Sequence, residues 1–179
     1  TPGARLPSLA LALTLAPERF AAFLSTDPFP LTPFPPTEET IMNVQPYLSF
    51  EGRAQEALDF YKSALGATVD VVMLFKDAPP EVQPHIQESS KNKVMHASFR
   101  VGDTQIMASD GQCTGKAVFS GVFLTLNTST PAEAEKFFAA LGQGGKVTMP
   151  MNETFFAHRF GTVADKFGVN WMVLAPKAM

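Results

Sequence analysis

Residues Val44–Gly66 read VQPYLSFEGRAQEALDFYKSALG, and this stretch decides the fold. Its first part, Val44–Phe50, is rich in strand-forming residues and is followed by Gly52. Apolar residues then recur at helical spacing until Gly66 ends the run, namely Ala54, Ala57, Leu58, Tyr61 and Leu65. The stretch therefore predicts one β-strand, a tight turn and one helix.

The same pattern recurs later in the chain. Glu133–Phe138 (EAEKFF) matches Glu56–Tyr61 (EALDFY) at an offset of 77 residues. The segments that follow also match, since GATVDVVM begins at Gly66 and GGKVTMPM begins at Gly144. Two further strand-like runs come after each copy. The sequence therefore predicts a tandem repeat of βαβββ modules.

The two modules are expected at residues 42–112 and 118–176, within one domain of residues 42–179. In the first module we predict strands at 44–50, 68–75, 94–101 and 104–109, and a helix at 52–65. The last two strands form a hairpin through Gly102-Asp103, which is a strong two-residue turn pattern. In the second module we predict strands at 118–126, 146–151, 155–163 and 170–175, and a helix at 131–141. The fold class is α+β: helices cover one face of a curved mixed sheet, and the other face surrounds a cavity.

Residues 1–41 differ in composition from the rest of the chain. Residues 26–40 (TDPFPLTPFPPTEET) contain five prolines, which favours an extended tether. Leu6–Ala16 has the length of the apolar part of a signal peptide, but Pro17-Glu18 follows it directly. Export stays an alternative, and we favour an N-terminal extension with a Pro-rich linker.

Composition and charge exclude several classes of function. The 179 residues are 45% hydrophobic, which is ample for a core. The net charge is −3 without an extended basic cluster, which argues against nucleic acid or an anionic membrane as partner. No apolar run approaches the roughly 20 residues of a membrane helix. The single Cys113 cannot form an internal disulfide, so we expect a cytoplasmic protein.

The tandem βαβββ pattern resembles the vicinal oxygen chelate superfamily, which includes glyoxalase I, extradiol dioxygenases and bleomycin or fosfomycin resistance proteins. In particular, the chain resembles the PhnB-like branch over residues 42–176. The matching motifs are Pro46-Tyr47-Leu48 with Glu56-Ala57-x-x-Phe60-Tyr61, then Met95-His96-Ala97, Met107-Ala108-Ser109-Asp110, Gly144-Gly145-Lys146-Val147 and Asp165-x-Phe167-Gly168-Val169-x-Trp171. Members of this branch are sometimes labelled as methyltransferases of ubiquinone synthesis. Such an enzyme needs a glycine-rich turn between a strand and a helix, whereas Gly142–Gly145 follows a helix and precedes a strand.

The resemblance also implies where a metal ion would be held. In the metalloenzymes of the superfamily, ligands come from the first and last strands of each module. The corresponding positions here are Gln45, Met107, Val122 and Met172, and only Gln45 is a usable ligand for an ion that prefers nitrogen and oxygen donors. We therefore expect no metal cofactor. A divalent ion at a different cluster, made of His96, His158 and Asp110, stays an alternative.

Several residues are candidates for contact with a ligand. On the first strand, Pro46, Leu48 and Phe50 should face the helix, so Gln45, Tyr47 and Ser49 should face the cavity. The full set of candidates is Gln45, Tyr47, Ser49, His96, Asp110, Phe156, His158 and Trp171. A turn-forming role competes for Asp110, and a core position competes for Phe156 and Trp171.

These observations predict a metal-independent protein that binds a small molecule in the sheet cavity. The resemblance implies a homodimer, because related proteins often complete their cavities across two chains. The alternative is a metal-dependent lyase, isomerase or dioxygenase that acts on a substrate with vicinal oxygens. A third hypothesis is metal-free acid/base chemistry by His96 or His158. No catalytic residue is assigned.

Overall fold

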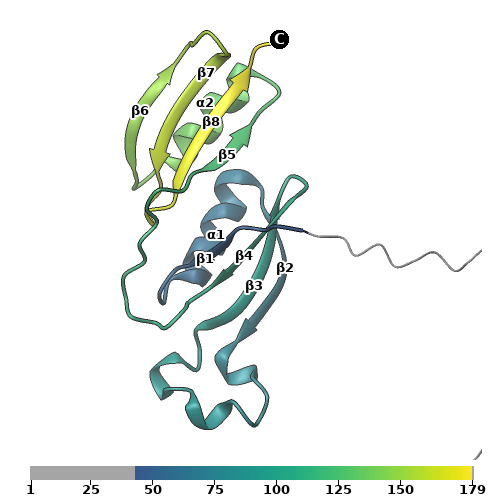
Figure 1. The fold of residues 1–179 in the computed structure, drawn as a ribbon, viewed down its shortest axis with the longest axis vertical. Coiled ribbons are helices and arrows are strands. Elements are labelled where there is room, and N and C mark those ends of the chain that lie inside the picture. The colour runs from purple at the N-terminus through teal and green to yellow at the C-terminus, as the bar shows by residue number, and fades with distance from the viewer. Residues whose placement is uncertain (1–42, 179) are drawn as a thin grey trace, which may run out of the picture. The chain divides into compact units, whose positions relative to one another are not determined.

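The computed structural model describes residues 43–178, so the predicted extension at 1–41 lies outside the described residues. Two four-stranded sheets are present, with strand orders β1-β4-β3-β2 and β5-β8-β7-β6 (Figure 1). In each sheet the outer pair, β1–β4 or β5–β8, is parallel, and the remaining pairs are antiparallel. The predicted pair of βαβββ modules with mixed sheets is confirmed.

The first module follows the predicted order of elements. It consists of β1 (Tyr47–Ser49), α1 (Ala54–Leu65), β2 (Thr68–Leu74), β3 (Val94–Val101) and β4 (Thr104–Ser109). The proline-containing loop between β2 and β3 forms three short 3₁₀ turns, at Phe75–Asp77, Gln83–His85 and Glu88–Ser90. The β3–β4 hairpin turns at Gly102-Asp103, as the sequence predicts.

The second module contains β5 (Leu124–Asn127), α2 (Pro131–Leu141), β6 (Lys146–Asn152), β7 (Ala157–Ala164) and β8 (Asn170–Pro176). The prediction of a strand at 118–126 is wrong for its first six residues. Residues 118–123 form no ladder, and Gly121 has a φ of 73°. The side-chain amide of Asn170 holds this segment instead, by donating to the backbone oxygen of Phe119 at 2.8 Å.

Both helices have well-formed ends. Gly66 adopts the left-handed conformation after α1, and its N–H donates to the Lys62 oxygen. At the start of α2, Thr130 and Glu133 form a reciprocal capping box, and Pro131 occupies the first turn. These local patterns explain why both helices could be placed from the sequence.

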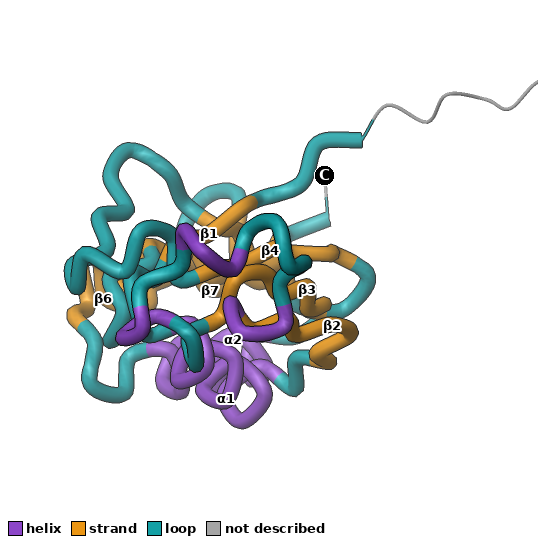
Figure 2. Tube along the Cα trace, turned by 90° about the horizontal axis from the view of Figure 1, so that it is seen from below, coloured by secondary structure: helices purple, strands orange, loops and turns teal. Residues whose placement is uncertain are grey.

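The helices lie on one side of the sheets (Figure 2). Leu48 and Phe50 of the β1 region are 7% and 1% exposed, and they pack in the core with Leu58 of α1. Burial of such side chains stabilises each by about 1.5–3 kcal/mol. Tyr47, which precedes Leu48 in the alternation, is 51% exposed, so Leu48 and Phe50 face the helix and Tyr47 faces away from it, as predicted. Within residues 43–178, no helix is long and apolar enough to cross a membrane.

Candidate functional site

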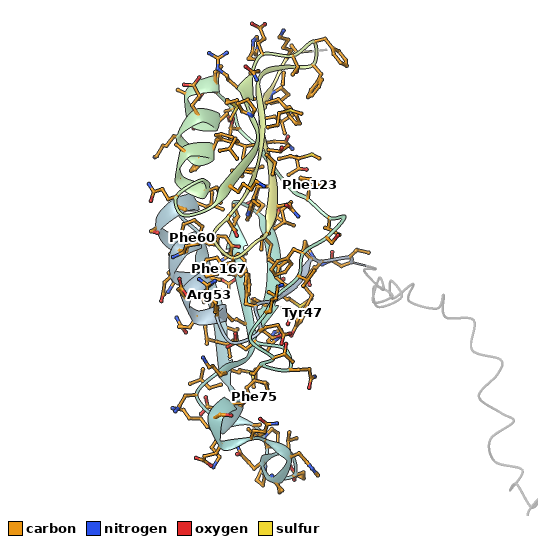
Figure 3. All side chains as sticks on the ribbon, turned by 90° about the vertical axis from the view of Figure 1, so that its left-hand side faces the viewer. Tyr47, Arg53, Phe60, Phe75, Phe123 and Phe167 are labelled. Carbon is orange, nitrogen blue, oxygen red and sulfur yellow. The ribbon has the colours of Figure 1, made fainter. Side chains whose placement is uncertain are left out.

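The face of the first sheet that the helices do not cover carries a row of polar and polarisable side chains. Tyr47 is paired with Met107, which is in turn paired with Ser98, so the three side chains share one face. Figure 3 shows Tyr47 on the opposite side of the sheet from Arg53, Phe60 and Phe167. We refer to the face formed by Tyr47, His96, Ser98, Gln105 and Met107 as the open face.

Two predicted site residues meet on the open face. The Tyr47 and His96 rings lie with centroids 6.1 Å apart and planes inclined by 36°. Beside them, the side-chain amide of Gln105 donates to the Ser98 hydroxyl at 2.9 Å, and Gln45 donates to the Gln105 oxygen at 2.6 Å. The face therefore offers two aromatic rings and a chain of neutral hydrogen-bonding groups.

Ser49 is tied into a separate polar cluster at the end of β1. Its hydroxyl donates to the Glu51 carboxylate at 2.8 Å, and Thr114 donates to the same carboxylate from its N–H and its hydroxyl. The hydrogen bonds from Thr114 are the main reason that the pKa of Glu51 is lowered to about 2. Gly111 has a φ of 54°, and a Cβ there would collide with the Ser49 hydroxyl and the Glu51 carboxylate. Ser49 therefore helps to hold the loop after β4.

The prediction that Asp110 contacts a ligand does not agree with its surroundings. Its side chain is 1% exposed, and its carboxylate accepts hydrogen bonds from the N–H groups of Gly52, Ala54 and Val94 at 2.6–2.8 Å. Because Ala54 is the first residue of α1, Asp110 satisfies the start of this helix from a distant loop. Its role is structural.

Trp171 also lies away from the open face. In β8 it alternates with half-buried positions and shares the helix-covered face with Val173, and it is 2% exposed. Its indole N–H donates to the Asp165 carboxylate at 3.0 Å. Asp165 also accepts from the Tyr61 hydroxyl at 2.7 Å. Burial and the neighbouring charge of Asp165 raise the pKa of Tyr61 well above its ordinary value, so the hydroxyl stays a donor.

The candidates Phe156, just before β7, and His158, within β7, are not brought to the open face of the first sheet. His158 lies at an irregularity in the pairing of β7 with β8 and is exposed. Phe156 is 38% exposed and contacts Phe160, with ring centroids 5.3 Å apart. Arg159 pairs with Glu135 of α2 at 2.6 Å, so its side chain lies on the helix-covered face.

The positions of the metal ligands in the superfamily do not suit a divalent ion here. The Gln45 amide is already bonded to Gln105, Met107 offers only a thioether, and Val122 has no donor atom. Within residues 43–178, no three His, Cys, Asp or Glu side chains are grouped so that they could hold a metal ion. The residues present therefore do not fit the metal centre that the fold implies.

A cavity of about 160 Å³ borders Tyr47 on the side of the second module. Val122, Leu124 and Asn170 are among its lining residues. The sequence did not point to Asn170, because the contact depends on how the segment before β5 folds over β8. A further cavity, of about 210 Å³, lies in the 3₁₀ region and includes His85 and Cys113.

The family model described as 3-demethylubiquinone-9 3-methyltransferase matches residues 42–174. Protein YjdN of Escherichia coli strain K12 is 37% identical over 138 residues, which cover 74% of this chain and 94% of that protein. The match therefore extends over nearly the whole length of this relative.

Solved structures show the same architecture. Protein PA1353 from Pseudomonas aeruginosa is 38% identical with a TM-score of 0.65, and the match covers 75% of this chain and 97% of that chain. A putative 3-demethylubiquinone-9 3-methyltransferase, PhnB protein, from Bacillus cereus is 25% identical with a TM-score of 0.62, covering 75% and 99%. A glyoxylase/bleomycin resistance protein/dioxygenase domain from Frankia sp. EAN1pec, 13% identical with a TM-score of 0.50 and covering 79% and 100%, is similar in fold alone. The chain therefore belongs to the PhnB-like family, whose model is described as 3-demethylubiquinone-9 3-methyltransferase, and has the glyoxalase/bleomycin resistance fold.

Proposed function

We propose that this protein binds a small molecule on the open face of its first sheet, without a metal ion. The observation that carries the proposal is the pairing of the Tyr47 and His96 rings, at 6.1 Å, beside the Gln45–Gln105–Ser98 chain of hydrogen bonds. The aromatic rings provide contact area for a planar ligand, and the Tyr47 hydroxyl and the His96 imidazole provide orientation.

Charge on and beside the open face favours an uncharged ligand. Arg100 is the neighbouring cation on the same face, and its guanidinium is held by both oxygens of Asp70 at 2.8–3.2 Å. This bidentate pair leaves the nearby charges balanced. The groups that remain for a ligand are the hydroxyl of Tyr47, the imidazole of His96 and the thioether of Met107.

The methyl transfer named in the description of the family model is not part of the proposal. Gly142 is the C-cap of α2, and the glycine run ends where β6 begins at Lys146. In doubly wound folds, the glycine-rich turn that holds a nucleotide-like cofactor joins a strand to a helix. The glycine run here has the opposite order, as predicted.

We further propose that a second copy of the chain completes the site. Val71 pairs with Ser98 and Met73 pairs with His96, so these apolar side chains border the polar ones on the open face. They are 45% and 38% exposed, and β2 is an edge strand. Burying this border would exclude water from the ligand and strengthen its hydrogen bonds.

Ligand binding is tested by thermal shift against a library of small neutral aromatic compounds. At least one compound should raise the melting temperature of the wild-type protein, and His96→Ala and Tyr47→Ala should lose this shift. His85→Ala is the matched control, because His85 lies in an exposed 3₁₀ turn and should keep the shift. A shift that persists in both open-face variants would refute the proposed site.

The assembly is tested by light scattering on the eluting protein. The wild type should have the mass of a dimer, and Val71→Glu should shift it towards the monomer by placing a charge in the apolar border. Val118→Glu is the control, because Val118 is 74% exposed in the segment before β5. A monomeric wild type at micromolar concentration would contradict the proposed assembly.

A further inference from the structure

A third cavity, of about 460 Å³, lies along the seam between the two modules. Its lining residues come from the approach to β1, the β3–β4 hairpin, β5 and β8, namely Pro46, Val101, Gly102, Asp103, Thr104, Ile106, Phe123, Leu124, Thr125, Leu126, Asn127 and Trp171. We call it the seam cavity. Its volume is within the range of about 300–1,000 Å³ that is usual for small-molecule sites.

Strand pairing explains why a cavity forms at this place. β1 pairs with β4 only over Tyr47–Ser49, so the first residues of β4 have no strand partner on that side. β5 is likewise an edge strand, because its sheet neighbour is β8 alone. Edge strands carry backbone N–H and C=O groups without ladder partners. The seam cavity therefore has hydrogen-bonding backbone groups on two of its walls.

The lining combines an apolar interior with a single charged group. Ile106 and Trp171 are 3% and 2% exposed, and Phe123 is 42% exposed. Figure 3 shows Phe123 on the same side as Tyr47, away from the helices. Asp103 is the one charged residue of the lining. Within residues 43–178, no ion pair includes Asp103, and the nearby Arg100 is bound to Asp70.

We propose that the seam cavity is a second binding site, separate from the open face, for a small arylalkylamine, that is, a protonated amine joined to an aromatic ring by a short alkyl chain. The aromatic ring would contact the exposed Phe123 beside the buried Trp171, and the ammonium group would donate to Asp103 and to backbone oxygens of the strand edges. An ammonium group has three donors and no acceptor, which suits a carboxylate flanked by carbonyl oxygens. A carboxylate ligand of the same size would face the charge of Asp103 instead.

Trp171 makes the proposal directly measurable. It is the single tryptophan of the chain, so its fluorescence reports on one place. Phenethylamine is the probe, and 3-phenylpropionate is the probe of similar size with the opposite charge. We expect phenethylamine to change the Trp171 emission with saturation and to shift the amide resonances of residues 124–127. 3-Phenylpropionate should bind at least about threefold more weakly.

Two variants locate the site. Asp103→Asn should weaken phenethylamine binding about threefold, as expected for an exposed charge pair, and Glu81→Gln is the control that removes an exposed carboxylate elsewhere. Thr125→Phe should weaken binding at least about tenfold by filling the cavity, and an aromatic residue is well tolerated on an exposed strand position. His96→Ala should leave the affinity unchanged.

Three results would overturn the proposal. The first is the absence of a saturable Trp171 response to phenethylamine at millimolar concentration. The second is equal affinity for the two probes together with no effect of Asp103→Asn, which would refute an amine site. The third is loss of phenethylamine binding in His96→Ala, which would place the amine on the open face and not in the seam cavity.

Discussion

The Tyr61 hydroxyl donates a 2.7 Å hydrogen bond to the Asp165 carboxylate across 104 residues of sequence. Tyr61 belongs to α1, and Asp165 follows β7, so this contact joins the two modules. The same carboxylate accepts from the Trp171 indole and from the N–H groups of Phe167 and Val169. A buried carboxylate without a cation is stable here because four donors surround it.

Substitution of Asp165 should lower the free energy of unfolding more than substitution of Tyr61. Tyr61→Phe removes one donor and should lower the free energy of unfolding by about 1–2 kcal/mol. Asp165→Ala leaves the Tyr61 hydroxyl and the Trp171 N–H buried without an acceptor, and should cost about 3 kcal/mol or more. Urea unfolding measures both. Tyr47→Phe, at an exposed tyrosine, is the control and should change stability by less than about 0.5 kcal/mol.

The contact also shows where prediction from the sequence stops. The strand and helix patterns, the capping residues and the Gly102-Asp103 turn are local, and they placed most elements to within two residues. The alternation of Trp171 with Val173 and Ala175 favours the core position, which the sequence left open beside a contact with the ligand, and the structure shows the core position. The partnership of Asp165 with Tyr61 has no local pattern, because it depends on how the modules dock.

The role of Asp110 also depends on a long-range contact that no local sequence pattern predicts. The sequence offered a turn or a cavity role, and the structure shows a carboxylate that caps α1 from 56 residues away through the N–H of Ala54. Asp110→Ala should lower the free energy of unfolding by about 2–4 kcal/mol, since the buried N–H groups of Ala54 and Val94 and the partly buried N–H of Gly52 lose their acceptor. Asp59→Ala, at an exposed position within α1, is the control, and denaturant unfolding is the measurement. A cost equal to that of the control would contradict the structural role.

A side chain at Gly111 should destabilise the fold by colliding with Ser49 and Glu51, and this effect can be separated from the strain of the left-handed backbone. Gly111 and Gly102 have nearly equal φ values, 54° and 57°, but only Gly111 has neighbours within reach of a Cβ. Gly102→Ala should therefore show the cost of the left-handed backbone alone, about 1 kcal/mol. Gly111→Ala should cost clearly more, because Ser49 and Glu51 must move. Equal thermal destabilisation of the two variants would contradict this prediction, because it would show that the Ser49 and Glu51 side chains move aside at no cost in stability.

Glu51 should make stability depend on acid. Its pKa is lowered from 4.5 to about 2 in the folded protein, so the folded state binds this proton more weakly than the unfolded state. The ionised carboxylate therefore stabilises the fold above about pH 4.5, and this contribution is lost as the pH falls towards 2. Glu51→Gln should be less stable than wild type near pH 6, and the difference should shrink near pH 3. Denaturant unfolding at both pH values checks this, and a difference that does not change with pH would contradict it.

Metal content tests the function that the fold suggests by analogy. Gln45 is engaged with Gln105, and the remaining superfamily positions, Met107, Val122 and Met172, carry thioethers or no donor. We therefore expect elemental analysis of the purified, untagged protein to find far less than one equivalent of Zn, Mn, Fe, Ni or Co, also after soaking. A chelator should leave the melting temperature unchanged. If a metal ion were bound, its removal would lower the melting temperature, because an ion present at 100 times its Kd stabilises the folded state by about 2.7 kcal/mol. Near one equivalent of metal that is lost in His96→Ala or His158→Ala would instead reveal a relocated metal site. That result would favour the alternative enzyme, and substrates with two adjacent oxygens would then be the ones to assay.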